Sequence, residues 1–126
     1  VVLVDGFDST QIVDDLVSEA FFQNCFDALS DKGVFVTNWW RDDKRFHVFT
    51  TRLRAVFGDR VLEVPAENHG NVAVMAFKNT PKELDMFALR RKAAKLGRTY
   101  HINFEKILTD ICQSNLTSDQ KLYFPD

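Results

Sequence analysis

Hydrophobic positions divide the first forty residues into a strand, a helix and a second strand. The apolar run VVLV (residues 1–4) predicts a strand covered on both faces, as in parallel α/β sheets, and such a strand should not lie at an outer edge. From Ser18 to Leu29 apolar residues recur at helical spacing, and Lys32 with Gly33 signals the end of this helix. The run that follows directly predicts a second buried strand, GVFVTNWW.

The next segment adds a second helix and a pair of strands. After Asp42 and Asp43, which can cap a helix start, the spacing predicts an amphipathic helix that ends at Gly58. Residues 61–64 (VLEV) and 72–77 (VAVMAF) are strand-like runs separated by loop residues, so they predict an antiparallel pair. This order of elements is typical of the second half of a doubly wound α/β sheet that is closed by a hairpin.

Beyond this hairpin the pattern predicts helices. Residues 80–83 (TPKE) form a capping-box pattern with proline at the first helical position, which predicts a helix to about Leu96 that Gly97 stops. Apolar spacing predicts a last helix over residues 104–111, and we expect the tail, residues 114–126 (SNLTSDQKLYFPD), to be irregular.

Composition and charge argue against several classes of partner. The 126 residues include 16 basic and 18 acidic side chains, and a formal net charge of −2 gives no electrostatic footprint for nucleic-acid binding. The apolar runs are too short to span a bilayer, so we expect neither nucleic acid nor a membrane as a partner. Cys25 and Cys112 lie in apolar helical patterns, which favours buried thiols and a cytoplasmic protein.

Two carboxylates directly after the first strand are the main candidates for chemistry. In open α/β sheets ligands bind outside the carboxyl ends of the strands, and Asp5 and Asp8 occupy that position with Gly6 permitting a tight turn between them. Such a pair suits a cationic amine, because one carboxylate can anchor an ammonium while the other accepts a proton. The alternative is an ordinary polar turn at Asp8 and a strand end at Asp5, and the pattern is compatible with both.

Aromatic and histidine side chains are less specific candidates. Trp39 and Trp40 are adjacent on a predicted strand and point to opposite faces, so at most one can line a site. The separations of His47, His69 and His101 match no metal-ligand set, which favours surface or structural roles and predicts no bound metal. Of the three, His69 lies in the loop that would face the site.

Three runs resemble one enzyme family: VVLVDGFDS, FFQNCFDALSDKGVFVTN and VPAENHGNVAVMAF. Their order and spacing are similar to those of the spermidine synthase family of aminopropyltransferases, in which a sheet strand ends in an Asp-x-x-Asp motif. The resemblance implies the C-terminal half of a doubly wound, Rossmann-like sheet of the AdoMet methyltransferase type, with a closing hairpin and C-terminal helices. It covers residues 1–78, as half of a catalytic domain, and leaves residues 79–126 as a helical extension.

The resemblance also implies a reaction and roles for four residues. Asp5 would be the general base, Asp8 would anchor the substrate amine, and Asn38 would be a polar residue on the substrate side. Glu67 stands where the family usually has a tyrosine that lines the polyamine site. The reaction would be displacement of methylthioadenosine from decarboxylated AdoMet by a primary amine such as putrescine, without a metal.

Two features depart from that family. The chain has STQIVDD where the family has a Pro-x-Gly-Pro loop, and it contains no GxGxxG-like loop for the nucleoside cofactor. We therefore expect the cofactor-binding residues in a missing N-terminal half, and we expect this fragment alone to be inactive. Two other functions stay open: a non-catalytic interaction module on the same fold, and a small-molecule AdoMet-dependent methyltransferase.

The first strand also carries a prediction about association. If residues 1–4 lie mid-sheet in a longer protein, their edge here is unpaired and apolar, which makes it adhesive. We expect self-association through this edge, or coverage of the edge by the helices after residue 80.

Overall fold

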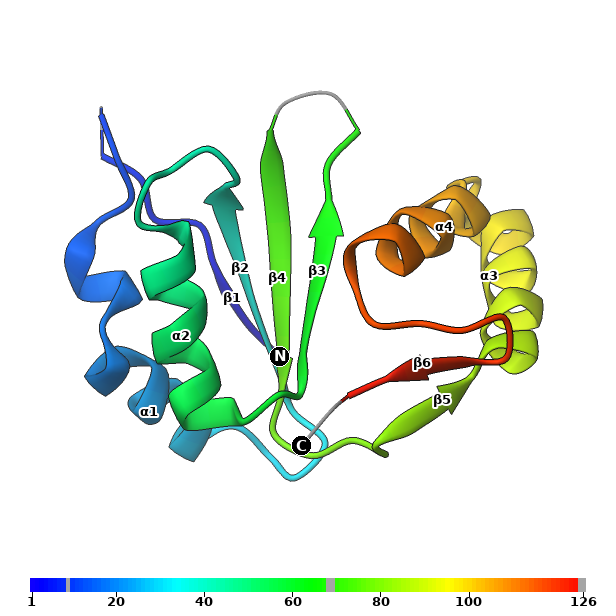
Figure 1. Cartoon of the computed structure of the whole chain (residues 1–126), viewed down its shortest axis with the longest axis horizontal. Coiled ribbons are helices and arrows are strands. Elements are labelled where there is room, and N and C mark those ends of the chain that lie inside the picture. The colour runs from blue at the N-terminus through cyan, green and yellow to red at the C-terminus, as the bar shows by residue number, and fades with distance from the viewer. Residues whose placement is uncertain (9, 68–69, 125–126) are drawn as a thin grey trace.

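The computed structural model describes residues 1–8, 10–67 and 70–124, which form an α/β fold around a mixed four-stranded sheet (Figure 1). The strand order is β1-β2-β4-β3, with β1 parallel to β2 and the other neighbours antiparallel. In chain order the elements are β1 (Val2–Val4), the 3₁₀ helix η1 (Asp14–Val17), α1 (Glu19–Ala28), β2 (Val34–Trp40), α2 (Phe46–Phe57), β3 (Val61–Pro65), β4 (Asn71–Phe77), β5 (Glu83–Asp85), α3 (Met86–Tyr100), α4 (Phe104–Ser114) and β6 (Lys121–Tyr123).

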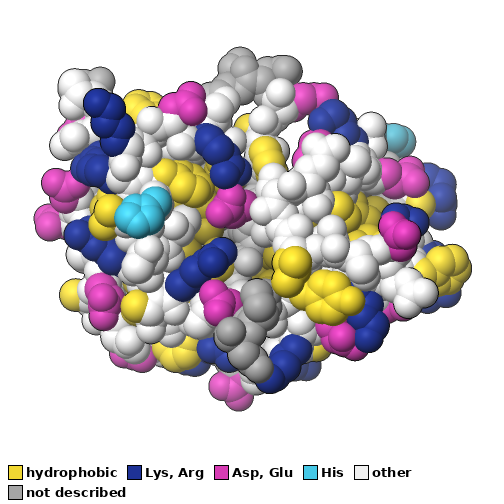
Figure 2. Space-filling view, viewed as in Figure 1, with side chains coloured by type: hydrophobic (Ala, Val, Ile, Leu, Met, Phe, Trp, Pro, Cys, Tyr) yellow, Lys and Arg dark blue, Asp and Glu magenta, His cyan; other side chains and the backbone are white. Residues whose placement is uncertain are grey.

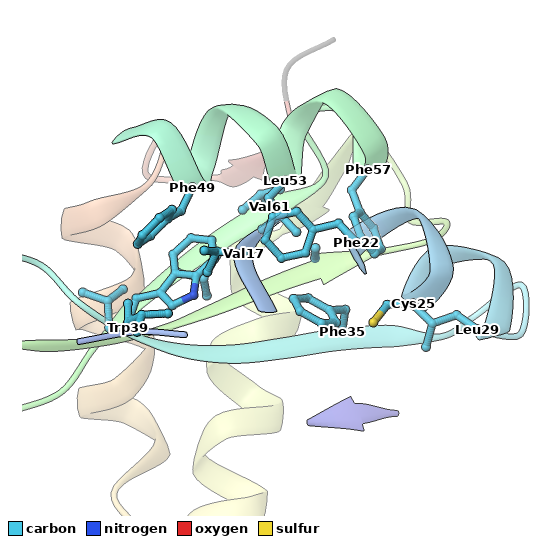
Figure 3. Close-up of a cluster of buried hydrophobic side chains, with 14 residues drawn as sticks. Val17, Phe22, Cys25, Leu29, Phe35, Trp39, Phe49, Leu53, Phe57 and Val61 are labelled. Carbon is cyan, nitrogen blue, oxygen red and sulfur yellow. The ribbon is translucent and has the colours of Figure 1, made fainter. Parts of the chain in front are cut away.

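An aromatic core fills the space between the sheet and the helices α1 and α2 (Figure 3). Alternation along β2 directs Phe35 and Trp39 into this core, so helices pack on one face of the predicted strand. The rings of Phe22 and Phe57 lie 5.7 and 5.9 Å from that of Phe35, so α1, β2 and α2 meet at one cluster. The predicted start of α1 is confirmed, because the Ser18 side chain accepts a hydrogen bond from the Phe21 amide.

The two adjacent tryptophans face opposite sides of the sheet, as predicted. Trp39 is fully buried in the aromatic core, and its indole N–H has no hydrogen-bond partner among the described residues. Trp40 is partly exposed and stacks on Phe7, with 4.8 Å between the ring centroids. Only Trp40 therefore lies near the loops where a ligand could bind.

The first strand is at the edge of the sheet, so the expectation that it would not be an outer strand is wrong for the described chain. Val2 and Val4 pack on the aromatic core, but Leu3 points to the other face and is 74% exposed. A strand is buried on both faces only where further layers cover it, and the described residues place no layer over Leu3. The helices α3 and α4 lie on the β3 side of the sheet and do not cover this edge (Figure 1). Self-association through the edge stays a prediction.

The helix expected from residues 80–83 begins later. Asp85 is its N-cap and accepts a 2.6 Å hydrogen bond from the Ala88 amide, while Glu83 belongs to β5. The capping-box pattern was misleading because pairing of β5 with the distant β6 holds residues 83–85 extended.

Gly97 does not end α3, which continues to Tyr100. The helix ends at His101, a residue with a left-handed backbone (φ 56°) whose amide donates to the Gly97 carbonyl. A Cβ at Gly97 would lie 3.0 Å from the Ile102 carbonyl oxygen, so this glycine permits the close return of the chain into α4.

The tail is ordered, contrary to the expectation that residues 114–126 would be irregular. Residues 121–123 form β6, and Leu122 and Phe124 are buried in a second core with Met86 and Leu62. The segment predicted as a helical extension therefore contains a two-stranded sheet as well as α3 and α4. Since Leu62 belongs to β3, this second core joins the segment to the face of the main sheet opposite α2.

One side chain of the tail, that of Asn115, forms hydrogen bonds with the backbone of the edge strand β3. The Asn115 side chain accepts a 2.9 Å hydrogen bond from the Glu63 amide and donates one of 2.8 Å to the Glu63 carbonyl. It thus pairs with β3 as the backbone of another strand would, and this limits edge-to-edge association at that side of the sheet.

Replacement of Leu122 tests the second core. Leu122→Ala is expected to lower the free energy of unfolding by about 2–5 kcal/mol, because it opens a cavity at a fully buried site. Denaturant unfolding of the chain measures this change. Leu116→Ala, at a position that is 59% exposed, is the matched control and should change stability by less than about 0.5 kcal/mol. Equal effects of the two substitutions would contradict an ordered tail.

Acidic and basic side chains are interspersed over the face seen in Figure 2, and neither sign gathers into a large patch there. Among the described residues, no helix has the length and apolar character needed to cross a membrane.

Candidate active site

A row of hydrogen-bonded polar side chains lies at the end of the sheet where β1 and β2 have their carboxyl ends. Asp5 follows β1 and Asn38 lies near the end of β2, and the parallel pairing of these strands brings both residues to the same edge. Asn38 Nδ2 donates to Asp5 Oδ1 at 3.2 Å, and Asn71 Nδ2 donates to Asn38 Oδ1 at 3.0 Å. Asn71 begins the antiparallel strand β4 and is a diagonal neighbour of Asn38, so three strands contribute to this row.

The two asparagines fix the environment of the Asp5 carboxylate. Because the Asn38 oxygen accepts from Asn71, its amide nitrogen is directed at Asp5. Asp5 is exposed, and no second hydrogen bond reaches its carboxylate from the residues that the structure describes. One carboxylate oxygen is therefore oriented by the sheet, and the other is open to accept a proton from a ligand.

Asp8 is bound into its own turn. Its Oδ1 accepts hydrogen bonds from the backbone amides of Thr10 (2.7 Å) and Gln11 (2.8 Å) and from the Thr10 hydroxyl. The bonds from these amides hold the pKa of Asp8 below its usual value, so the carboxylate is ionised at neutral pH. The polar-turn interpretation of Asp8 is thus correct for one oxygen, while Oδ2 accepts no hydrogen bond within the described part of the chain.

A cavity of about 410 Å³ lies between Asn38 and Asn71 on the sheet and the helix α4. Its floor is a row of cross-strand neighbours on β2, β4 and β3, namely Asn38, Ala73 and Val64, which point away from the aromatic core. The opposite wall comes from α4 and the turn before it, including Lys106 and Ile107. The cavity is therefore mainly apolar, with polar groups at defined points, as is typical of small-molecule sites.

Glu67 also lines this cavity, and its carboxylate is paired. Lys106 Nζ lies 3.4 Å from Glu67 Oε1 and 2.8 Å from Asp110 Oδ2. The hydrogen bond to Asp110, together with the charge of Glu67, raises the pKa of Lys106, so its ammonium stays protonated. Asn38 and Glu67 thus share one cavity, whereas Asp8 does not line it.

Sequence reasoning missed Asn71, Lys106 and Asp110. The spacing of Lys106 and Asp110 is a visible (i, i+4) pair on a helix, but such pairs are usually surface features. Only the packing of α4 against the β3 side of the sheet shows that this pair lines the same cavity as Asn38 (Figure 1).

A second hollow, of about 630 Å³, lies beside the Asp8 turn. Trp40 and Gly70 line it together with the loop that precedes α2. Arg45 stabilises this loop, because its guanidinium pairs with Asp14 at 2.6 Å and with Asp43 at 3.1 Å.

The histidines do not contribute to the cavity as far as it is described. His47 lies on α2 and His101 ends α3, and neither is a lining residue. His69 and Ser9 lie outside the described residues. Within the described ranges, no three His, Cys, Asp or Glu side chains cluster in a way that could hold a metal ion. Both cysteines are free thiols; Cys25 is buried as predicted, whereas Cys112, also predicted to be buried, is only half-buried.

The structure is thus an α/β fold in which Asp5, Asn38 and Asn71 are joined by hydrogen bonds at the carboxyl ends of two parallel strands, the position at which open α/β sheets bind ligands. Polyamine aminopropyltransferases of Neisseria meningitidis serogroups A and B are 54% identical to the chain over 115 residues, which is 91% of it. The corresponding protein of Chromobacterium violaceum is 51% identical over 114 residues. The chain belongs to the spermidine synthase-like family of aminopropyltransferases.

The chain spans 44% of the length of these relatives. An alignment of 115 residues necessarily continues beyond residue 78, so the family likeness extends further than the sequence motifs indicate, into the segment that carries α3 and α4. No protein-family profile and no solved structure matches the chain.

Proposed function

We propose that the chain supplies the acceptor-amine site of a polyamine aminopropyltransferase. Residues 1–78 would form the C-terminal half of a catalytic domain of the AdoMet methyltransferase type, and residues 79–126 would close the amine site. The observation that carries the proposal is the hydrogen bond from Asn38 to Asp5 at the carboxyl edge of the sheet, beside a cavity with apolar walls. The names of the curated relatives support the same activity.

Asp5 is the general base in this proposal. The nitrogen of a primary amine attacks the aminopropyl carbon next to the sulfonium of decarboxylated AdoMet, and the C–S bond breaks with both electrons moving to sulfur. The amine loses a proton as the new C–N bond forms, and the open oxygen of Asp5 accepts that proton. The products are the aminopropylated amine and methylthioadenosine, so charge and atoms balance.

The other site residues take binding roles. The free oxygen of Asp8 anchors an ammonium of the acceptor, and the low pKa of this carboxylate keeps it charged for that purpose. Asn38 positions Asp5 and presents its amide to the acceptor, while Glu67 supplies negative charge in the cavity. The donor would bind to a part of the protein outside this chain, because the sequence contains no glycine-rich loop for its nucleoside.

Methylthioadenosine release tests the proposal in the full-length protein. We would mix that protein with decarboxylated AdoMet and a panel of mono- and diamines, and expect release that depends on one class of amine. Methyl transfer from ordinary AdoMet would contradict the proposal in favour of a methyltransferase. Absence of release with every amine, by a protein that is folded and binds the donor, would favour a catalytically silent interaction module.

Asn38 provides a second test of the same site. Asn38→Ala is expected to lower kcat by roughly 10- to 100-fold with a small change in KM, because it removes one hydrogen bond to a charged group that acts in the transition state. Asn71→Ala should lower kcat less, since Asn71 reaches Asp5 only through Asn38. An unchanged kcat in Asn38→Ala would show that this hydrogen bond does not serve the reaction.

A further inference from the structure

The turn that carries Asp8 folds back against the end of β1. The Asp8 amide donates to the Gln11 carbonyl at 2.9 Å, and the Val13 amide donates to the Gly6 carbonyl at 3.1 Å. A Cβ at Gly6 would overlap the Leu16 side chain, so Leu16 packs directly on this glycine. The two ends of the turn therefore meet beside β1, and the place of Asp8 depends on the residues that follow it.

One guanidinium joins these following residues to the start of α2. Arg45 Nη1 lies 2.6 Å from Asp14 Oδ1 in η1, and Arg45 Nε and Nη2 donate to the two carboxylate oxygens of Asp43 at 3.2 and 3.1 Å. The guanidinium also lies over the Phe49 ring, with 5.0 Å between Cζ and the ring centroid. Asp43 and Phe49 thus orient Arg45, and its remaining N–H groups are directed at Asp14.

The two carboxylates that Arg45 binds differ in exposure. The Asp43 side chain is 11% exposed and makes the bidentate contact, whereas the Asp14 side chain is 73% exposed and makes a single contact. A bidentate pair away from water is stronger than a single pair in water. The contact with Asp14 is therefore the one that opens first, and Arg45 stays on Asp43 when it does.

The contact with Asp14 joins two walls of one hollow. Thr10 and Gln11 of the turn and Arg45 at the start of α2 line the hollow of about 630 Å³. The hydrogen bond from the Thr10 amide is the main cause of the low pKa of Asp8, and the positive charge of Arg45 adds to it. Arg45 is therefore linked to Asp8 both through the turn and through its charge.

We propose that Arg45 is a positioning residue that holds the Asp8 turn in place through Asp14. This inference rests on the proposed function. With the contact closed, the Asp8 carboxylate is in place before the amine binds. With the contact open, only a fraction of the molecules presents Asp8 to the amine, and the apparent affinity for the amine falls by that fraction. The bound amine selects the closed turn, so kcat changes little.

Asp14→Asn tests this role in the full-length protein. The substitution removes the charge from an exposed side chain, so it should raise the KM for the amine about 2- to 5-fold and leave kcat nearly unchanged. Partial unfolding would do the opposite, because it lowers kcat per total protein and leaves KM unchanged. A KM that stays at the wild-type value in an active protein would overturn the inference.

Three further variants show whether the effect belongs to this contact. Asp15→Asn removes the same charge from the next exposed residue and should leave KM unchanged. Asp14→Glu keeps the carboxylate and should keep KM within about 2-fold of wild type. Arg45→Met should raise KM at least as much as Asp14→Asn, and the double variant should raise it no further, because both substitutions break one contact. Effects that multiply in the double variant would contradict the proposal.

Amide hydrogen exchange keeps the inference distinguishable from the proposed function. The Val13 amide should exchange about 2- to 5-fold faster in Asp14→Asn than in Asp15→Asn, and this measurement needs no catalysis. If no amine supports methylthioadenosine release but this exchange and the calorimetric affinity for the amine both respond to Asp14→Asn, the proposed function fails while the positioning role stands. If release occurs and KM does not respond, the positioning role fails and the proposed function stands.

Discussion

Asp5→Asn in the full-length protein is expected to lower the kcat of amine-dependent methylthioadenosine release by about 10²–10⁴-fold, the usual contribution of a positioned general base. The amide has nearly the shape of the carboxylate, so Asn38 can still contact position 5. An amide, however, cannot accept the proton that the attacking amine must lose. The KM for the amine should change much less than kcat.

Asp31→Asn is the matched control for this experiment. Asp31 is exposed and lies before the first residue of β2, whereas Asp5 lies after the last residue of the parallel strand β1. The two residues are therefore at opposite ends of the strands. The same acid-to-amide change there should leave kcat unchanged. If Asp5→Asn retained wild-type kcat while remaining folded, Asp5 would be only the polar end of a strand, and the assignment of a general base would be wrong.

Phe35→Ala is expected to produce the largest loss of stability, about 3–5 kcal/mol in the free energy of unfolding. Phe35 is fully buried on β2, and its ring contacts the rings of Phe22 and Phe57 from α1 and α2 (Figure 3). The substitution removes these contacts and leaves a cavity at the centre of the core. Denaturant unfolding followed by circular dichroism would measure the change.

Phe87→Ala provides the comparison for that measurement. Phe87 lies on α3 and is 74% exposed, so its truncation should change stability by less than about 0.5 kcal/mol. A loss at Phe35 as small as that at Phe87 would contradict the packing of both helices against the Phe35 face of β2. If Phe35→Ala does not fold at all, Phe35→Leu should give a smaller loss of the same sign.

Local patterns were sufficient for the first part of the fold. Alternation in β2 places Phe35 and Trp39 on one face, and Ser18 caps α1 where the spacing predicts its start. These features depend on contacts within one element or between successive elements. Periodicity reports such contacts directly.

Features that depend on distant pairing could not be read from the sequence. Residues 121–123 become a strand only because Glu83 and its neighbours pair with them, and the same pairing delays the start of α3 to Met86. Gly97 looks like a helix stop, yet its function is to admit the Ile102 carbonyl. In each case the partner lies outside the window in which the pattern is judged.

Some residues of the candidate site could likewise be predicted from the sequence, and others could not. The position of Asp5 and Asn38 follows from the rule that parallel strands present their carboxyl ends at one edge, and the structure joins the two residues by a hydrogen bond. The participation of Asn71 requires the register of β2 on β4, and that of Lys106 requires the packing of α4 on the β3 side of the sheet. Neither the register nor this packing follows from hydrophobic periodicity.

Transfer of a labelled aminopropyl group tests the central claim most directly. The full-length protein would be mixed with a diamine and with decarboxylated AdoMet that carries carbon-13 in the aminopropyl group. The masses of the amine products would then be measured by mass spectrometry. We predict a product amine heavier by one labelled aminopropyl group, formed together with methylthioadenosine and lost in Asp5→Asn. Methylthioadenosine without a labelled amine, or a labelled amine that Asp5→Asn forms as fast as the unaltered protein, would contradict the account.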